Sequence, residues 1–212
     1  MKDLVNTDSQ SGLNLFAGDF RKVLIGIIII AGAGILAAGT VIGKITKGAI
    51  AAVAKAGNTG DGTLTVDAAT PILGYAVPGA YIARCITAAV GGGTFRVYHP
   101  HGYALGDVAV GATFANQIKF AIAAGAADFI VGDEFSITIA AGSGKYKAYD
   151  DTKVDGTDKA VAILAEDVDA TLEDVVATAY VSGQFNEAAL TGLDDAAKDD
   201  FAGTPVFFGT IV

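Results

Sequence analysis

The stretch Val23–Gly43, VLIGIIIIAGAGILAAGTVIG, decides which fold class this 212-residue chain adopts. It carries no charged residue and lies between Lys22 and Lys44. About 20 apolar residues in one helix span a bilayer, so the length alone is typical of a membrane anchor. Glycines interrupt the stretch, however, and it contains the β-branched run Ile27–Ile30. These features favour two buried strands joined by a glycine turn at residues 31–34.

The composition of the whole chain also favours short strands and tight turns. The chain is 52% apolar, with 28 glycines and only 17% charged residues. Apolar and polar residues alternate cleanly in several segments, as in half-buried antiparallel strands. These segments lie at 64–66, 94–98, 117–122 and 134–139. We therefore expect a mainly β protein with an immunoglobulin-like β-sandwich over residues 57–141.

The flanking regions give less regular signals. Further strands are expected at 145–149, 161–164 and 175–181, and residues 49–55 favour a short helix or strand. Asn186 can cap a helix that continues to about Asp200. Residues 201–212 then read as a final strand. Residues 1–19 predict a flexible N-terminal arm, because they begin with a polar run; the apolar Leu13, Leu15, Phe16 and Phe20 at its end are candidates for docking onto a partner surface.

Charge and cysteine content limit the function. The net charge is −9 and no basic stripe is present, so nucleic-acid binding is not expected. The single cysteine, Cys85, excludes an intrachain disulfide. Alternation places Cys85 on one strand face with Tyr81 and Ala83, opposite Arg84, which favours a buried thiol over a reactive one.

Several short motifs imitate chemical sites without completing them. Residues 32–37 resemble a dinucleotide fingerprint but lack the acidic residue about 20 positions later. Residues 39–44 are one residue too short for a phosphate-binding loop, and residues 151–162 lack two ligands of a calcium loop. His99 and His101 are too few to close a metal site. We expect no catalytic, cofactor or metal site, and no enzymatic activity.

A series of motifs then resembles one known family, the head decoration proteins of tailed bacteriophages, typified by phage lambda head protein D. The main pieces are GTVIGKIT at 39–46 and GKYKAYD at 144–150, on either side of the predicted sandwich. Shorter pieces in the same order lie at 16–20, 155–157, 162–164, 167–171 and 186–190. The resemblance covers roughly residues 13–55 and 141–200.

This resemblance implies a small α+β, β-tulip-like decoration domain formed by residues 20–56 and 142–212. The inserted β-sandwich at 57–141 divides it. It also implies a homotrimer on the outer surface of the virion, bound to the major capsid protein and stabilising the mature shell. Residues 1–19 would be the capsid-binding arm, with Leu13, Leu15, Phe16 and Phe20 as its apolar anchors.

Two alternatives come from other function classes. One is a membrane-anchored surface protein in which residues 23–43 span the bilayer. A capsid decoration protein, in contrast, would not need a membrane. The other is a glycan-binding or glycan-cleaving β-protein. Tyr98, His99 and Tyr103 are the candidate residues for a glycan, and a host-surface glycan bound by the inserted domain is compatible with capsid decoration.

Overall fold

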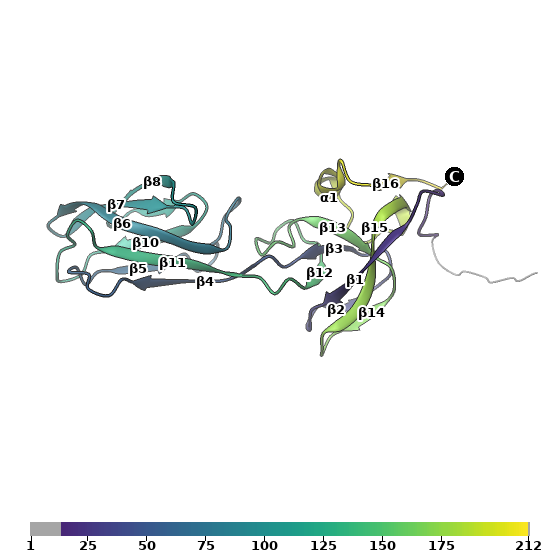
Figure 1. Ribbon diagram of the computed structural model, residues 1–212, viewed down its shortest axis with the longest axis horizontal. Coiled ribbons are helices and arrows are strands. Elements are labelled where there is room, and N and C mark those ends of the chain that lie inside the picture. Colours follow the sequence, from purple (N-terminus) through teal and green to yellow (C-terminus); the bar gives the residue numbers. More distant parts are fainter. Residues whose placement is uncertain (1–13, 212) are drawn as a thin grey trace, which may run out of the picture. The chain divides into compact units, whose positions relative to one another are not determined.

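The computed structural model describes residues 14–211 and divides them into two compact units, drawn in Figure 1. The barrel unit is formed by residues up to Ile45 and from Gly144 onward, and the second unit is Thr46–Ser143. Strands dominate both, which confirms the mainly β prediction. Within the described residues, no helix is both long and apolar enough to cross a membrane.

The barrel unit is built on a closed ring of five strands. Its order is β1-β12-β3-β13-β15, and β1 closes the ring because it pairs with both β12 and β15. The five strands are β1 (Val23–Ile29), β3 (Val41–Lys44), β12 (Tyr146–Ala148), β13 (Ala160–Leu164) and β15 (Val175–Asn186). The β1–β12 pair is parallel and the other pairs of the ring are antiparallel.

Alternation along β1 explains why this segment is a strand. Ile27 and Ile29 are buried, whereas Leu24, Gly26 and Ile28 lie on the exposed face. The stretch 23–43 therefore forms two short strands and the start of a third instead of one membrane helix. The predicted direct pairing within it is wrong. β1 pairs with β15, and β2 (Gly34–Leu36) pairs with β14 (Val168–Ala170).

The C-terminal end of the barrel unit differs from the prediction. Asn186 caps only a single 3-10 turn, Glu187–Ala189, and the α-helix α1 (Asp195–Phe201) begins separately at its own cap, Asp194. The backbone at Leu190 and Thr191 is extended, and Thr191 exchanges backbone hydrogen bonds with Gly39 and Val41, so the 3-10 turn does not continue into α1. Residues 201–212 are not one strand: β16 is confined to Val206–Gly209 and runs parallel to β15.

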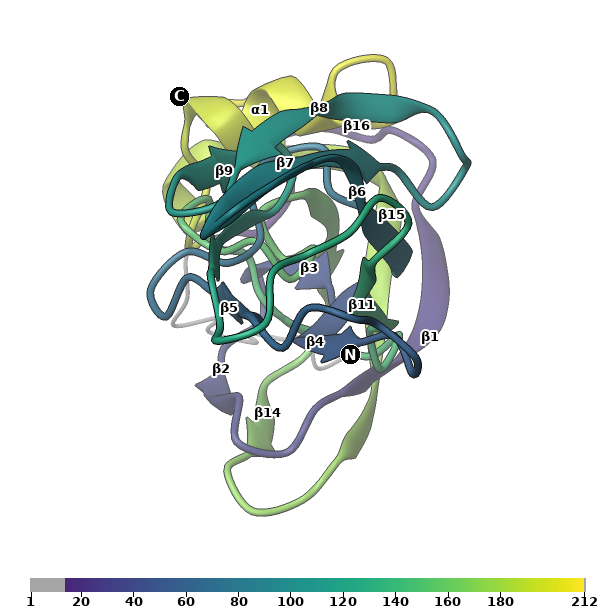
Figure 2. The ribbon, with the colours of Figure 1, turned by 90° about the vertical axis from the view of Figure 1, so that its left-hand side faces the viewer.

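The second unit consists of two antiparallel sheets that share one core. The larger sheet has the order β4-β11-β6-β7-β8 and the smaller has β5-β10-β9. Figure 2 views this unit end on, with β7 between β6 and β8. The strands are β4 (Lys47–Ala54), β5 (Thr63–Val66), β6 (Gly79–Ala89), β7 (Gly92–Tyr98), β8 (Ala104–Ala109), β9 (Thr113–Ala115), β10 (Lys119–Ala123) and β11 (Glu134–Ala141).

The core of the second unit follows the predicted alternation. Phe95, Phe120 and Ile137 are at most 1% exposed and come from both sheets. Cys85 lies beside Tyr81 and Ala83 in this core, as predicted, with Arg84 on the opposite face. β4 is a strand of this unit and pairs with β11, so the unit begins earlier in the sequence than the predicted boundary at 57.

The chain leaves and re-enters the barrel unit at neighbouring positions. The N–H of Ile45 donates to the carbonyl of Lys145 at 2.9 Å, and the N–H of Gly144 donates to the carbonyl of Ile45 at 3.0 Å. On the other side of the boundary, the N–H of Gly142 donates to the carbonyl of Thr46 at 2.9 Å. Residues 46–143 therefore interrupt the barrel sequence without separating β3 from its partner β12.

Candidate interaction surface

Residues 14–17, part of the predicted flexible arm, are hydrogen-bonded to the end of β15. The N–H of Asn186 donates to the carbonyl of Leu15, and the N–H of Ala17 donates to the carbonyl of Gln184, both at 3.0 Å. The buried side chain of Asn186 also donates to the carbonyl of Asn14. This short segment thus adds to β15 as an extra strand-like edge.

Leu15 and Phe16 pack against the barrel unit's own core in this structure. The ring of Phe16 meets Tyr180 edge to face at 5.3 Å and lies 5.5 Å from Phe185. The ammonium group of Lys22 lies 4.3 Å from the centre of the Phe16 ring, within cation–π range. Both predicted anchors therefore have intramolecular partners, and their role in capsid binding stays a prediction.

Phe20 differs from them because its side chain faces solvent. It is 40% exposed, and its ring meets that of Phe207 edge to face at 4.8 Å. Phe207, on β16, is 47% exposed. The fourth predicted anchor, Leu13, lies outside the described residues. Residues from opposite ends of the sequence thus form an exposed aromatic pair, and Phe207 is the partner that sequence reasoning missed.

A groove of about 410 Å³ lies beside Phe20. Four of its six lining residues are apolar, and Ser182 is occupied by a hydrogen bond to the carbonyl of Arg21. The lining residues are Phe20, Arg21, Val23, Val181, Ser182 and Pro205. An apolar groove beside an exposed aromatic pair is typical of a site that receives a side chain from another protein.

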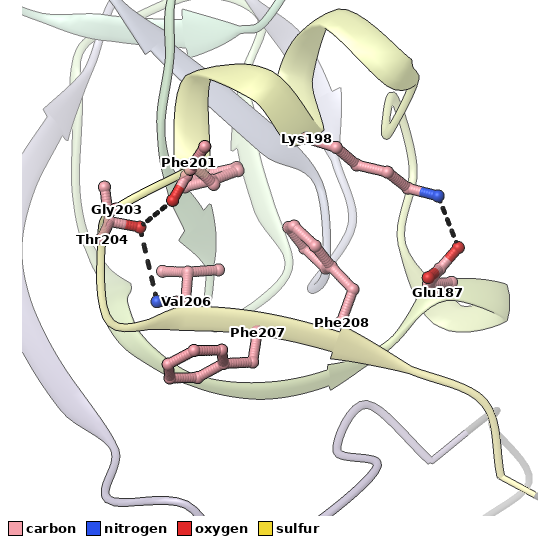
Figure 3. Close-up of a pocket in the computed structure, with 9 residues that line it drawn as sticks. Glu187, Lys198, Phe201, Gly203, Thr204, Val206, Phe207 and Phe208 are labelled. Carbon is pink, nitrogen blue, oxygen red and sulfur yellow. Dashed lines mark hydrogen bonds and ion pairs between the residues drawn. The ribbon is translucent and has the colours of Figure 1, made fainter.

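A second hollow, of about 280 Å³, lies between α1 and β16 (Figure 3). Phe208 points toward α1 while Phe207 points to the other side of the strand, as alternation requires. At the rim, the ammonium group of Lys198 lies 2.7 Å from the carboxylate of Glu187. This hydrogen bond raises the pKa of Lys198 above its ordinary value, at which a lysine is already charged at neutral pH.

Neither hollow offers a set of groups for chemistry. Across residues 14–211, no group of three or more His, Cys, Asp or Glu side chains is placed to hold a metal ion. We describe the exposed pair Phe20–Phe207 with its two flanking hollows as the aromatic surface. Its centre is apolar and its rim is charged, an arrangement that is common among protein-binding surfaces.

The second unit has a hollow of its own, of about 350 Å³, at one end of its larger sheet. Tyr98 and His99, two of the three predicted glycan candidates, line it. Tyr103, the third, is 52% exposed and stacks on His99 with ring centres 4.3 Å apart. Sequence reasoning did not connect these residues with Arg84, which lines the same hollow from the neighbouring strand β6.

Comparison with known protein families identifies the chain. The family model "Bacteriophage lambda head decoration protein D" matches residues 25–204, a range that includes most of the barrel unit and all of the second unit. The chain belongs to this head decoration protein family. Members of the lambda head decoration protein D family are structural, non-enzymatic proteins of the virion capsid surface. Capsid decoration is therefore the general function of this protein.

Other comparisons add little. Two crystal forms of FlgL from Xanthomonas campestris match with 20% identity and a TM-score of 0.33. Each match covers 56% of this chain and 40% of the FlgL chain, and similarity at this level carries no argument about fold or function. No curated protein sequence matches the chain.

Proposed function

We propose that this protein binds as homotrimers to the outer face of a phage head, contacts the major capsid protein and stabilises the mature shell. The family match over residues 25–204 carries this proposal. The aromatic surface supports it, because an aromatic side chain has few rotatable bonds and loses little freedom when a partner covers it, and Phe207 is on the strand β16.

Phe20 and Phe207 are the anchors that we assign to capsid binding. Leu15 and Phe16 already pack within the protein, so they position Phe20 by holding the preceding residues against β15. The Lys198–Glu187 pair at the rim adds orientation and little affinity, because solvent screens a half-exposed ion pair. Residues 1–13, which include Leu13, complete the proposed capsid-binding region.

Stabilisation of the mature shell follows from binding linkage. A protein that binds only one conformation of the capsid lowers the free energy of that conformation, by an amount that grows with the logarithm of its free concentration divided by its dissociation constant. A decoration protein specific for the mature lattice therefore stabilises that lattice after it has formed, and does not oppose assembly of the precursor.

The second unit supports an additional role. We propose that it is an immunoglobulin-like sandwich inserted into the decoration domain, and that on the shell it binds a glycan of the host surface. Two antiparallel sheets around one core support the sandwich class. The hollow beside Tyr98 supports glycan binding, because an aromatic side chain provides an apolar wall for a sugar ring.

The decisive experiment is cryo-electron microscopy of mature phage heads that lack this protein, incubated with purified variants. We expect trimeric density at the three-fold and quasi-three-fold positions for the wild type. Deletion of residues 1–13, or the double substitution F20A/F207A, should weaken or abolish that density. Density for a monomer or dimer would contradict the proposed trimer. Occupancy of the capsid by F20A/F207A at the wild-type level would contradict the proposed role of the aromatic surface.

A further inference from the structure

The hollow of the second unit lies on the outer face of its five-stranded sheet. Strand register places Arg84 directly opposite Glu134 on one side and Arg96 on the other. In the adjacent row, Ile82 lies opposite Tyr98. One end of the hollow is therefore charged, and its middle is apolar with an aromatic wall.

The hollow suits a single ring-sized ligand. Its volume of about 350 Å³ is near the lower end of the range of about 300–1,000 Å³ for small-molecule sites. Ala80 and Ile82 supply aliphatic contacts, and Tyr98 supplies a ring face. The C–H groups of a sugar ring match such a surface, while its hydroxyl groups need polar partners at the edges.

Hydrogen bonds hold the loop that closes the hollow. The N–H of His99 donates to the carbonyl of Tyr103 at 2.8 Å, and the N–H of Gly102 donates to the carbonyl of His99 at 2.7 Å. Gly79 allows this loop to approach, because a Cβ atom there would lie 2.8 Å from Pro100. A wall that is already in place lowers the entropic cost of binding.

Polar groups at the hollow are mainly donors. The Nε and Nη2 atoms of Arg84 both lie 2.8 Å from one oxygen of Glu134, and this leaves further N–H groups of the guanidinium for a ligand. The Arg84 side chain is 52% exposed whereas that of Glu134 is 12% exposed, so a ligand meets the cation first. The ammonium group of Lys55 lies 3.8 Å from the same carboxylate. Arg84, Lys55 and Glu134 together therefore carry one net positive charge.

His99 contributes to the wall of the hollow. It is only 4% exposed, and its ring meets the buried ring of Tyr81 edge to face at 5.5 Å, so the imidazole lies toward the core of the unit. Its Nδ1 accepts a hydrogen bond from the N–H of His101 at 3.0 Å, which helps to hold the loop beside the hollow.

From this arrangement we infer that the hollow lined by Arg84, Tyr98 and His99 binds a sugar residue that carries a carboxylate. The inference rests on the glycan-binding role proposed above and specifies its ligand class. Arg84 is the residue that binds the carboxylate, because a guanidinium presents its N–H groups in the geometry that a carboxylate accepts. Tyr98 contacts the ring.

The test is a titration of the full chain with trigalacturonate and with its fully methyl-esterified form, which removes the charge and keeps the sugar. Binding is followed through backbone amide NMR signals. We expect the acid to bind at least ~10-fold more tightly than the ester, with shifts at residues 80–84 and 98–102. Arg84→Gln keeps a hydrogen-bonding side chain beside Glu134 and should lose that preference.

Lys119→Gln is the control. Lys119 is on β10 of the smaller sheet, pairs with Asp67 at 3.0 Å and does not line the hollow, so its loss should leave binding unchanged. Equal binding of acid and ester, reduced by Tyr98→Ala and not by Arg84→Gln, would overturn the carboxylate inference and retain glycan binding. If neither sugar bound at concentrations up to about 10 mM, which corresponds to a binding free energy of about 2.7 kcal/mol, the carboxylate inference and the glycan-binding proposal would both be overturned. The proposed capsid role would not be affected.

Discussion

Phe20 and Phe207 meet edge to face with ring centres 4.8 Å apart, although 187 positions separate them in the sequence. Phe20 follows the segment that is hydrogen-bonded to β15, and Phe207 lies on β16, which pairs with the same strand. The two ends of the described chain therefore converge on β15 and present one aromatic surface.

Substitution of Phe207 by alanine should weaken binding to mature heads by at least ~10-fold, since truncating a central aromatic anchor typically costs about 2 kcal/mol or more. The side chain is 47% exposed, so the free energy of unfolding should fall by only about 1 kcal/mol. Binding is measured by sedimentation with capsids. Leu172→Ala, at a residue 92% exposed elsewhere on the barrel unit, is the control and should bind like the wild type. Equal loss in both variants would argue against an anchor at Phe207.

Replacement of Asn186 by alanine should release residues 14–17 from β15. Its buried side chain donates to the carbonyl of Asn14 and accepts from the N–H of Ala188, and lost buried hydrogen bonds cost about 1–3 kcal/mol. Hydrogen exchange at the amide of Ala17 should accelerate markedly. The comparison variant is Asn116→Ala, at an exposed residue whose amide bonds to the carbonyl of Leu105; its barrel unit should exchange normally. Unchanged protection at Ala17 in the Asn186 variant would show that backbone bonds alone hold the segment.

Gly43→Ala and Gly26→Ala make a matched pair within the barrel. A Cβ at Gly43 would lie 2.6 Å from the Cα and 2.7 Å from the carbonyl oxygen of Thr157, whereas a Cβ at Gly26 would meet nothing within 4 Å. Overpacking against backbone should destabilise the Gly43 variant by about 1–3 kcal/mol or more. The free energy of unfolding of the Gly26 variant should equal that of the wild type or be higher by a few tenths of a kcal/mol, which is about the lower limit for a glycine-to-alanine substitution that causes no strain. Urea unfolding measures both, and comparable midpoints would contradict this packing.

Asp133 should make the second unit sensitive to acid. Burial would raise the pKa of this carboxyl, but hydrogen bonds from the N–H groups of Thr59, Gly60 and Ile130 outweigh burial and lower it. Because the folded-state pKa is below the unfolded value of about 3.9, the contribution is present above that pH and is lost as the pH falls through the folded-state pKa.

Asp133→Ala should therefore destabilise the second unit by about 1–3 kcal/mol at neutral pH and flatten its pH dependence below pH of about 4. NMR signals of second-unit residues during urea unfolding report the effect. Asp128→Ala, which removes a single exposed hydrogen bond from the N–H of Gly91, serves as the control. An unaltered acid response in the Asp133 variant would assign the effect to other carboxyl groups.

Local patterns in the sequence predicted the strands, because the period of two reveals which side of a segment faces a core. Cys85 was placed correctly for this reason. The same patterns did not identify partners that are distant in the sequence. β1 pairs with β15, some 150 residues later, and not with β3, the next strand that the sequence predicted.

Helix caps show a similar limit. Asn186 and Asp194 both carry good capping signals, and only the extended backbone at Thr191, bonded to Gly39, restricts the first to a single turn. Of the candidate site, the sequence indicated Phe20 only as one of four apolar docking candidates, and it did not distinguish this exposed residue from Leu15 and Phe16, which pack against the core. The pairing of Phe20 with Phe207 was not foreseeable, because the pairing depends on the parallel alignment of β16 with β15. The immunoglobulin-like class of the second unit and the roles of the four predicted anchors stay predictions.

The adjacent crossings at Ile45 and Gly144 have a practical consequence. The outgoing and returning chains are one strand spacing apart, about 4.8 Å, so the barrel unit requires only that the two ends of an inserted domain lie close together. We therefore expect that residues 46–143 can be replaced by another domain. A foreign domain whose termini lie close together, or a short turn, should be accepted at this position. A phage that carries such a chimeric protein would display the foreign domain in as many copies as its shell has decoration sites.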